Sequence, residues 1–538
     1  MSRLHIWAGL LAGWLLYAMF LTGTVSYFRD EISQWMRPEL ARQTQAPDAA
    51  VVSQRIVDAM TRLAPDSPQW GIDLPDDRKN VSSVFWRNTG KGGRAFASAN
   101  LDPQTGGKLT LRDTAGGDFF YRFHFQFHYV SVLAGRWIAG LCAMFMLVAI
   151  ISGIITHKKI FVDFFTFRWG KGQRSWLDAH NALSVLGLPF HLMITYSGLV
   201  TLMLMYMPWG LQAAFPSASP RAALAAETTA FVPVGKASGT RAPLAPVADM
   251  VRQAQARWGA GNVGGLAVNH AGDAAARVIV MRGEAGRVST SPQYMMFEGA
   301  SGKLLQVKDH VGAAAETRGV LYALHLGRYA DDFTRVLYFL LSLAGTAMVG
   351  TGLVLWTVKR RQKLADPSRP HFGFRLVERL NIASIGGLSV AMTALLWGNR
   401  LLPVQLPDRS AWEINLFFIV WAAMLFYACA RPARKAWVEV LSLAAILLAL
   451  TPVLNAITTD RHLPASILAG DRVFAGFDLA LIGFAALHAW LAIRTARHEP
   501  HAARHEPHAA RRRPAGRRES PPRPRAHAQG GAGAGDAA

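Results

Sequence analysis

Cysteine is nearly absent from this sequence. Only Cys142 and Cys429 occur among 538 residues, and each lies within a long apolar run. The polar regions outside those runs therefore contain neither a disulfide framework nor a thiolate metal site. We expect both thiols to be inert packing residues.

Signatures of several enzyme classes are absent as well. No glycine-rich dinucleotide fingerprint follows a predicted strand, no phosphate-binding loop is present, and no nucleophile is accompanied by a convincing base. A redox function would therefore need a separate electron donor.

Acidic residues are scarce, with 35 Asp and Glu against 57 Lys and Arg and a formal net charge of +22. Much of the excess falls in connectors between apolar runs and in the segment from Arg494 onward, where ten Arg face four acids. Basic residues in such places are typical of membrane topology and of attraction to anionic lipid. Nucleic-acid binding is therefore not implied, and we expect residues 494–538 to form a disordered cytoplasmic tail.

Hydrophobic residues, in contrast, make up 51% of the chain, and the mean hydropathy is positive. This composition indicates a membrane protein in contact with the lipid bilayer. Eight apolar runs are suited to cross it as helices. They are residues 4–25, 137–156, 183–205, 336–358, 382–402, 412–430, 438–454 and 473–493. No small-residue cleavage site follows the first run, so we interpret it as a retained span.

The orientation follows from the connectors after the second, fourth and sixth runs, which are rich in Lys and Arg. The inside-positive bias places these connectors and both termini in the cytoplasm. Two long polar segments, roughly 29–125 and 210–325, then lie on the outer, periplasmic side of a bacterial inner membrane.

These outer segments repeat one order of predicted elements. A helix at 50–63, strands at 83–86 and 94–101 and a turn at 102–106 correspond to a helix at 247–258, strands at 265–268, 277–282 and 294–297, and a turn at 298–302. An aromatic-flanked histidine and then an arginine follow each segment: His128 with Arg136, and His325 with Arg335. The pattern predicts an internal duplication, with a working site at the repeat interface.

Histidines at membrane-relevant heights are the candidate site residues: His128, His157, His180, His191 and His325. Ionisable residues in spans usually have a partner or a function, and facing imidazoles on packed helices are a standard way to hold haem iron. Zinc would require three or four ligands close together, whereas these histidines are spread over the membrane depth. The plain alternative for each is an interfacial or core histidine satisfied by backbone and water.

We expect one haem toward each side of the membrane. His157 and His180 are candidates for the inner haem, His128 and His325 for the outer one, and His191 for completing either. On a continuous third span His180 and His191 would share a face to within ~20°, and on a continuous second span His128 and His157 would do so ~43 Å apart.

Secondary candidates are His124, four residues before His128, and Arg136 and Arg335 as partners of haem propionates. Interfacial anchoring is the alternative for the two arginines. We assign His488 to packing and His5 to the interface.

One stretch carries a family resemblance. Residues 150–202 contain the sequences SGIITHKK at 152–159, DFFTFR at 163–168, SWLDAHN at 175–181 and LPFHLMITYSG at 188–198. These sequences closely resemble the PepSY-associated transmembrane family. The turns at 102–106 and 298–302 resemble strand ends of PepSY modules, and Leu324–Gly327 resembles the motif before the fourth span of that family.

The resemblance covers roughly residues 1–360 and implies a four-helix core with PepSY-like periplasmic modules. Some members of the group are inner-membrane haem proteins that reduce ferric siderophores. By that likeness the five histidines above are the haem-site candidates to carry over. The four spans after Lys359 depart from the basic family pattern.

The expected fold is a mainly α-helical polytopic membrane protein with about eight transmembrane helices and two small α+β PepSY-like modules. Its expected parts are 1–28, 29–125, 126–209, 210–325, 326–363, 364–493 and 494–538. The expected function is a reductase with two b-type haems that passes electrons to a periplasmic acceptor, a ferric siderophore, from a quinol or a cytoplasmic reductase. The alternatives are a haem-free PepSY protein that binds or regulates a periplasmic partner such as a peptidase, and a transporter.

Overall fold

The computed structural model describes residues 2–40, 47–88, 95–156, 168, 172–214, 219–230, 232 and 235–497. The chain separates into two units, Met1–Ala496 and Arg497–Ala538, and the description below concerns the first unit. His157 lies outside the described residues.

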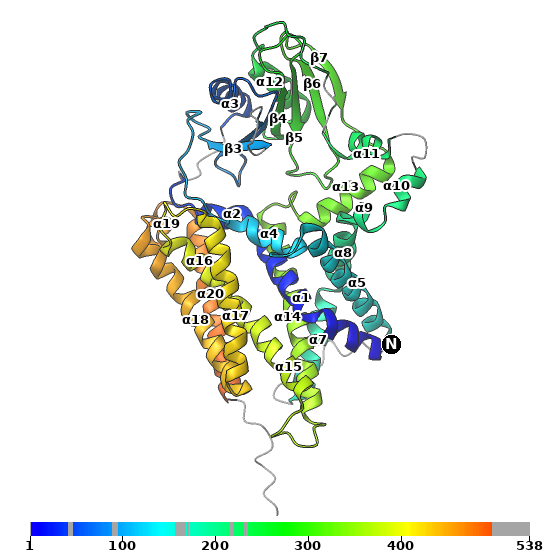
Figure 1. The fold of residues 1–538 in the computed structure, drawn as a ribbon, viewed down its shortest axis with the longest axis vertical. Coiled ribbons are helices and arrows are strands. Elements are labelled where there is room, and N and C mark those ends of the chain that lie inside the picture. Colours follow the sequence, from blue (N-terminus) through cyan, green and yellow to red (C-terminus); the bar gives the residue numbers. More distant parts are fainter. Residues whose placement is uncertain are drawn as a thin grey trace, which may run out of the picture. The chain divides into compact units, whose positions relative to one another are not determined.

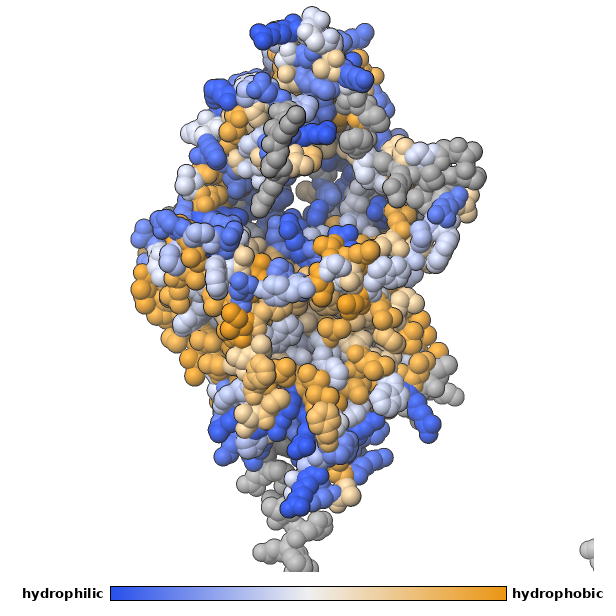
Figure 2. All heavy atoms as spheres, in the orientation of Figure 1, coloured by the Kyte–Doolittle hydropathy of each residue, from blue (hydrophilic) through white to orange (hydrophobic). Residues whose placement is uncertain are grey.

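Seven helices in the described part of the chain are long and apolar enough to cross a membrane, and a bent pair makes an eighth candidate span. They are α1 (Ser2–Ser26), α5 (Val132–Thr156), the pair α7 (Gln173–Leu186) and α8 (Leu188–Thr201), α14 (Asp332–Arg361), the stretch α15–η1–α16 (Phe372–Leu401), α17 (Arg409–Ala430), α18 (Ala433–Thr458) and α20 (Arg472–Arg497). Figure 2 shows their apolar side chains as a belt between hydrophilic regions. All eight predicted runs are confirmed as helical, and the protein is a multi-pass membrane protein.

The third span is bent by 69° between α7 and α8. Gly187 ends one helix and begins the next, and Pro189 occupies the first turn of α8. Proline has no backbone N–H and its ring clashes with the preceding turn, so a continuous helix is disfavoured here. The shared face expected for His180 and His191 on one straight helix is therefore not formed.

The polar segments form one antiparallel sheet of seven strands in the order β3-β2-β1-β4-β5-β6-β7 (Figure 1). The strands are β1 (Gln69–Asp73), β2 (Ser82–Arg87), β3 (Phe96–Leu101), β4 (Val263–Asn269), β5 (Arg277–Arg282), β6 (Tyr294–Glu298) and β7 (Leu304–Lys308). The two predicted modules are thus joined into one sheet through the pairing of β1 with β4. Strands β1 and β7 were absent from the sequence prediction.

Alternating side chains of β1 and β4 build the core of the sheet region. Trp70 pairs with Val268 and Ile72 with Leu266, and all four are buried. Residues two apart on a strand point to the same face. The helices α3 (Ala49–Leu63) and α12 (Val247–Trp258) pack against each other and share this core.

The duplicated turns are present in both repeats. Gly106 donates its N–H to the carbonyl of Asp102 at 2.8 Å, and Gly302 donates to that of Glu298 at 2.9 Å. Both glycines have positive φ, +70° and +73°, a conformation that glycine adopts without a steric penalty.

Two amphipathic helices lead from the sheet back to the spans. Helix α4 (Gly116–Gln126) follows the first strand set and packs against α1 and α5, whereas α13 (Ala313–Leu326) follows the second and packs against α8. We call the ends of the spans near α4 and α13 the sheet side. Short helices complete the described chain: α2 (Arg29–Trp35), α9 (Met203–Tyr206), α10 (Trp209–Ala214), α11 (Pro220–Thr228) and α19 (Leu463–Leu468).

The last helices begin with α15 (Phe372–Ile382), the π-helical turn η1 (Ala383–Gly387) and α16 (Leu388–Leu401). A buried ion pair on α17 connects these last helices to the rest of the membrane region. The Arg409 guanidinium and the Glu413 carboxylate are 2.5 Å apart, and both side chains are 0% exposed. Glu413 also accepts hydrogen bonds from the Thr114 hydroxyl and the Ala115 N–H, just before α4.

Candidate functional site

On the sheet side, the imidazoles of His124 and His325 face each other. His124 lies on α4 and His325 on α13, and their ring centroids are 6.1 Å apart with an interplanar angle of 32°. The Nδ1–H of His124 donates to the carbonyl of Met19 at 2.6 Å, and that of His325 donates to the carbonyl of Ile194 at 3.0 Å. We call these residues the sheet-side pair.

A second pair is formed by His5 of α1 and His180 of α7. Their ring centroids are 6.2 Å apart with an interplanar angle of 69°. The Nδ1–H of His5 donates to the carbonyl of Ala149, and that of His180 to the carbonyl of Met348, both at 2.9 Å. We call these residues the far-side pair.

A glycine four residues after each acceptor carbonyl lies against the imidazole. An added Cβ would stand 2.7 Å from His124 at Gly23, 2.8 Å from His325 at Gly198, 3.4 Å from His5 at Gly153 and 3.2 Å from His180 at Gly352. In a helix the carbonyl of residue n accepts the N–H of residue n+4. Glycine at that position removes the Cβ that would obstruct the ring, so the four sites share one construction.

The far-side histidines, and the acceptor carbonyls and glycines of all four sites, occur at corresponding positions in the two repeats. His5 corresponds to His180, Met19 to Ile194 and Gly23 to Gly198 by one constant shift along the sequence. A second constant shift relates Ala149 to Met348 and Gly153 to Gly352. The far-side pair therefore combines equivalent residues of the two repeats, and the carbonyls and glycines that contact the sheet-side pair are equivalent as well.

Burial favours the neutral form of both sheet-side imidazoles. Burial lowers the pKa of His124, and burial together with the neighbouring His124 lowers the pKa of His325 to about 3. A neutral histidine that donates its Nδ1–H to a carbonyl has its lone pair on Nε2, which is the usual arrangement of a metal-binding histidine.

The ring spacing of each pair would allow both imidazoles to hold one metal ion. An imidazole nitrogen binds a transition metal at about 2 Å and the ring centroid lies roughly 1 Å behind it, so two such rings have centroids roughly 6 Å apart. The described residues contain no group of three or more His, Cys, Asp or Glu that could hold a metal ion. Two histidines suffice for haem iron, because the porphyrin occupies the other four coordination positions.

The two pairs are separated along α1. Met19, the acceptor for His124, follows His5 by fourteen residues on this helix, a rise of ~21 Å. This is most of the ~30 Å hydrocarbon core of a bilayer.

Of the five predicted histidines, the structure places His180 and His325 in the pairs. His191 lies between them at 1% exposure, where its Nε2–H donates to the carbonyl of Leu341 at 3.3 Å. Its Nδ1 has no hydrogen-bond partner among the described residues. Gly187 and Gly345 provide the space for its ring.

His128 is placed in an aromatic cluster. Its ring stacks on Phe418 with centroids 5.6 Å apart and contacts Phe119 and Tyr129. Helix α5 begins at Val132, so the expected continuous helix from His128 to the second span is not formed. His157, expected beside His180, lies outside the described residues.

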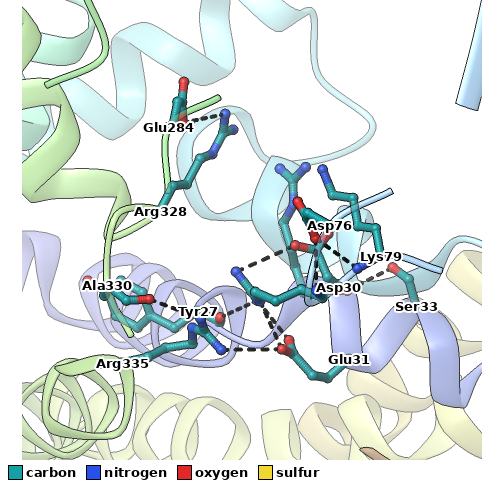
Figure 3. A network of polar contacts seen from close by, with 12 residues as sticks. Tyr27, Asp30, Glu31, Ser33, Asp76, Lys79, Glu284, Arg328, Ala330 and Arg335 are labelled. Carbon is teal, nitrogen blue, oxygen red and sulfur yellow. Dashed lines mark hydrogen bonds and ion pairs between the residues drawn. The ribbon is translucent and has the colours of Figure 1, made fainter. Parts of the chain in front are cut away.

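The arginine candidates are engaged with the protein. Arg335 forms an ion pair with Glu31 at 3.5 Å (Figure 3). It also forms one with Asp332 at 3.2 Å, and it is 7% exposed. Arg136 donates to the Gln126 side chain at 3.4 Å and lies over the Phe125 ring. These contacts favour the anchoring alternative for both.

His5 and His124 are the site residues that sequence reasoning undervalued. A usable signal was present, because each of His5 and His180 is followed eighteen residues later by a glycine, Gly23 or Gly198. The His488 ring donates to the Phe484 carbonyl and contacts the Ser389 hydroxyl, in agreement with a packing role.

Comparison with known sequences places both pairs within one matched region. The family described as PepSY-associated TM region matches residues 2–359. An uncharacterized protein of Pseudomonas aeruginosa is 27% identical over 383 residues, which cover 68% of this chain and 93% of the relative. Helices α15 to α20 lie beyond the family match.

Proposed function

Because the chain belongs to the family of PepSY-associated transmembrane regions, we propose that it is a bacterial inner-membrane reductase with two b-type haems. It passes electrons across the membrane to a periplasmic acceptor, a ferric siderophore, during iron acquisition. The observation that carries this proposal is the recurrence of one histidine construction four times, in two facing pairs. Packing alone gives no reason for four partly buried imidazoles to share the same kind of carbonyl and glycine partners.

The histidines, the backbone carbonyls and the glycines would each have a separate role. The four imidazoles hold the cofactor, the four carbonyls fix their tautomer and orientation, and the glycines allow the rings to lie close to the helices. When bound, haem supplies one-electron redox chemistry. The hydrocarbon core around the spans would exclude water and so lower the dielectric constant near a bound cofactor.

The proposed direction of electron flow follows from the charge of the helix ends. Helix α14 begins on the sheet side and ends with Lys359, Arg360 and Arg361. Basic residues at span ends favour the cytoplasm, which supports a periplasmic sheet and a far-side pair near the cytoplasmic surface. The far-side pair would accept electrons from a quinol or a cytoplasmic reductase.

A ferric chelate suits the sheet-side pair as acceptor. Ferric iron is held by hard oxygen donors, and one-electron reduction to Fe²⁺ weakens that binding. An electron delivered at the membrane surface would therefore release iron without direct contact between haem iron and the chelate.

The test is an absorption spectrum of the purified protein before and after dithionite, with haem quantified per chain. We expect about two haems per chain, about one in H325A and in H180A, and no change in H488A, which serves as a buried control on α20. Reoxidation of the reduced protein by ferric chelates would establish the acceptor. A fully expressed, folded protein without pigment would overturn the proposal in favour of a haem-free binding protein or a transporter.

A further inference from the structure

A group of arginines and tyrosines extends outward from the sheet-side pair. Arg318 precedes His325 by seven residues on α13, which places the two within ~20° on the helix face and ~10.5 Å apart along its axis. The Arg318 guanidinium lies over the Tyr322 ring, 5.2 Å from its centroid. The Nε of Arg318 is buried and has no hydrogen-bond partner among the described residues.

Helix α4 contributes a matching contact. Tyr121 precedes His124 by one turn, and the Arg29 guanidinium lies over the Tyr121 ring at 4.9 Å. Burial, followed by the neighbouring Tyr121, raises the pKa of Tyr322, so the two tyrosines lie near each other. Both repeats therefore place a tyrosine with an arginine above its ring close to the paired histidines.

The loop between β5 and β6 adds further positive charge to this group. The Thr290 N–H donates to the Gly319 carbonyl at 3.1 Å, so the loop lies on α13. Burial, followed by the neighbouring Arg282, lowers the pKa of Arg287. Neighbouring arginines of this kind are stabilised by an anion between them.

Nearby acidic residues neutralise only part of the positive charge of these arginines. Glu284 forms an ion pair with Arg328 at 3.3 Å, and both side chains remain accessible, at 34% and 40% exposure (Figure 3). Glu316 is the other acid that interacts with Arg287. Four arginines of the group, Arg282, Arg287, Arg318 and Arg328, thus face two glutamates on a partly open surface, whereas Arg29 is paired with Asp30 and Asp118.

We propose that Arg318 and Arg328, with Tyr121 and Tyr322, bind the acceptor through its negative charge, so that the preferred substrates are anionic iron chelates bearing carboxylates. This inference rests on the proposed function, because it assigns the acceptor site of the same reductase. Arginine pairs carboxylate through two parallel hydrogen bonds, and the tyrosine hydroxyls add donors. Haem propionates carry the same carboxylate chemistry, and the experiment below separates the two sources.

The test compares R318Q and R328Q with R252Q. Arg252 lies on α12 and forms an exposed ion pair with Asp249, so its variant controls for loss of a positive charge. Dithionite-reduced protein is mixed with anionic ferric citrate or with cationic ferrioxamine B, and reoxidation is followed in the haem bands. We expect R318Q and R328Q to raise the half-saturating concentration of ferric citrate about tenfold with the limiting rate unchanged. The half-saturating concentration of ferrioxamine B should not change in R318Q and R328Q. In R252Q the half-saturating concentrations of both chelates should equal those of the parent protein.

Redox-inert gallium(III) citrate provides a second readout by calorimetry that does not depend on haem. We expect its dissociation constant to rise about tenfold in R318Q and R328Q. Unchanged citrate binding, or an equal change for both chelates, would overturn the inference. Loss of haem or shifted bands in these variants would assign the arginines to the propionates instead. If the parent protein is colourless yet binds gallium citrate through these arginines, the anion site stands and the reductase proposal fails.

Discussion

Gly23 of α1 lies directly against the imidazole of His124 on α4, where an added Cβ would stand 2.7 Å from Nδ1. The contact belongs to a construction that recurs at Gly198, Gly153 and Gly352. It connects a small residue in one helix to the position of a proposed haem ligand in another, and it can be tested without altering any histidine.

We expect Gly23→Ala to lower the haem content from about two to about one per chain. The new methyl group would push the His124 ring away from the Met19 carbonyl, because a contact this short cannot be accommodated without movement. Gly9→Ala on the same helix is the control, since no atom lies within 4 Å of its added Cβ. Full haem content in Gly23→Ala would show that this contact does not position the ligand.

His191→Leu should retain both haems. His191 is not part of either facing pair, and the residue that corresponds to it in the first repeat is Leu16, by the same shift that relates His5 to His180. Its buried Nδ1 has no hydrogen-bond partner among the described residues, so an apolar side chain of similar size removes a desolvated polar group. Haem per chain is measured by the pyridine haemochrome spectrum. A loss of one haem would assign His191 to the ligand set.

The buried ion pair should make Glu413 far more important to stability than a surface acid. In Glu413→Ala the Arg409 guanidinium stays buried at 0% exposure without its carboxylate, a change that costs about 3–5 kcal/mol. Glu439→Ala is the control, because it removes an exposed pair with Arg431 at 43% and 33% exposure, and solvent screens such pairs so that they contribute little to stability. Thermal unfolding in detergent would compare the two. Equal shifts in the midpoint would contradict the structural role assigned to Glu413.

Protonation of Asp273 at acidic pH should reduce the stability of the structure around it. Its carboxylate accepts hydrogen bonds from the N–H groups of Ser238, Gly239 and Ala275, and these bonds lower its pKa from 3.8 to about 2. The pKa of Asp273 in the folded state lies below its value in the unfolded state. The contribution of the ionised carboxylate to stability is therefore complete above about pH 4 and is lost as the pH falls toward 2.

Hydrogen exchange at the Ser238 and Gly239 amides would report this titration. Protection should decrease between pH 4 and 2 in the parent protein, after correction for the intrinsic exchange rate, and should be low throughout in Asp273→Asn. A parent profile as flat as that of the variant would show that the carboxylate does not hold this loop.

Local sequence patterns were sufficient for most elements of the fold. All eight apolar runs are helices, and the predicted strands overlap β2 to β6. Strand β1 was missed because Gly71 interrupts its apolar pattern. The ring of Phe85, on the neighbouring strand β2, lies over Gly71. The other strand that pairs with β1 is β4, which is nearly two hundred residues away in the sequence. A strand stabilised by such distant partners leaves little local signal.

The candidate site was only partly accessible from the sequence. His180 and His325 were identified from their positions in spans and motifs, but pairing required knowledge of the bend at Gly187 and of the packing of α4 against α1. His5 and His124 were set aside because each lies near a helix end, where an interfacial role explains a histidine equally well. The tertiary structure brings each of them close to a second imidazole, with ring centroids 6.1 and 6.2 Å apart.

The sequence by itself determined that this protein crosses the membrane many times, that its first part is duplicated and that histidines recur near the span ends. These properties are expressed in hydropathy and spacing, which each segment carries alone. Only the tertiary structure decided which imidazoles face each other and that the two polar segments share one sheet. Both depend on contacts between residues more than a hundred positions apart, such as His124 with His325 and β1 with β4, and these contacts exist only once the repeats have packed together.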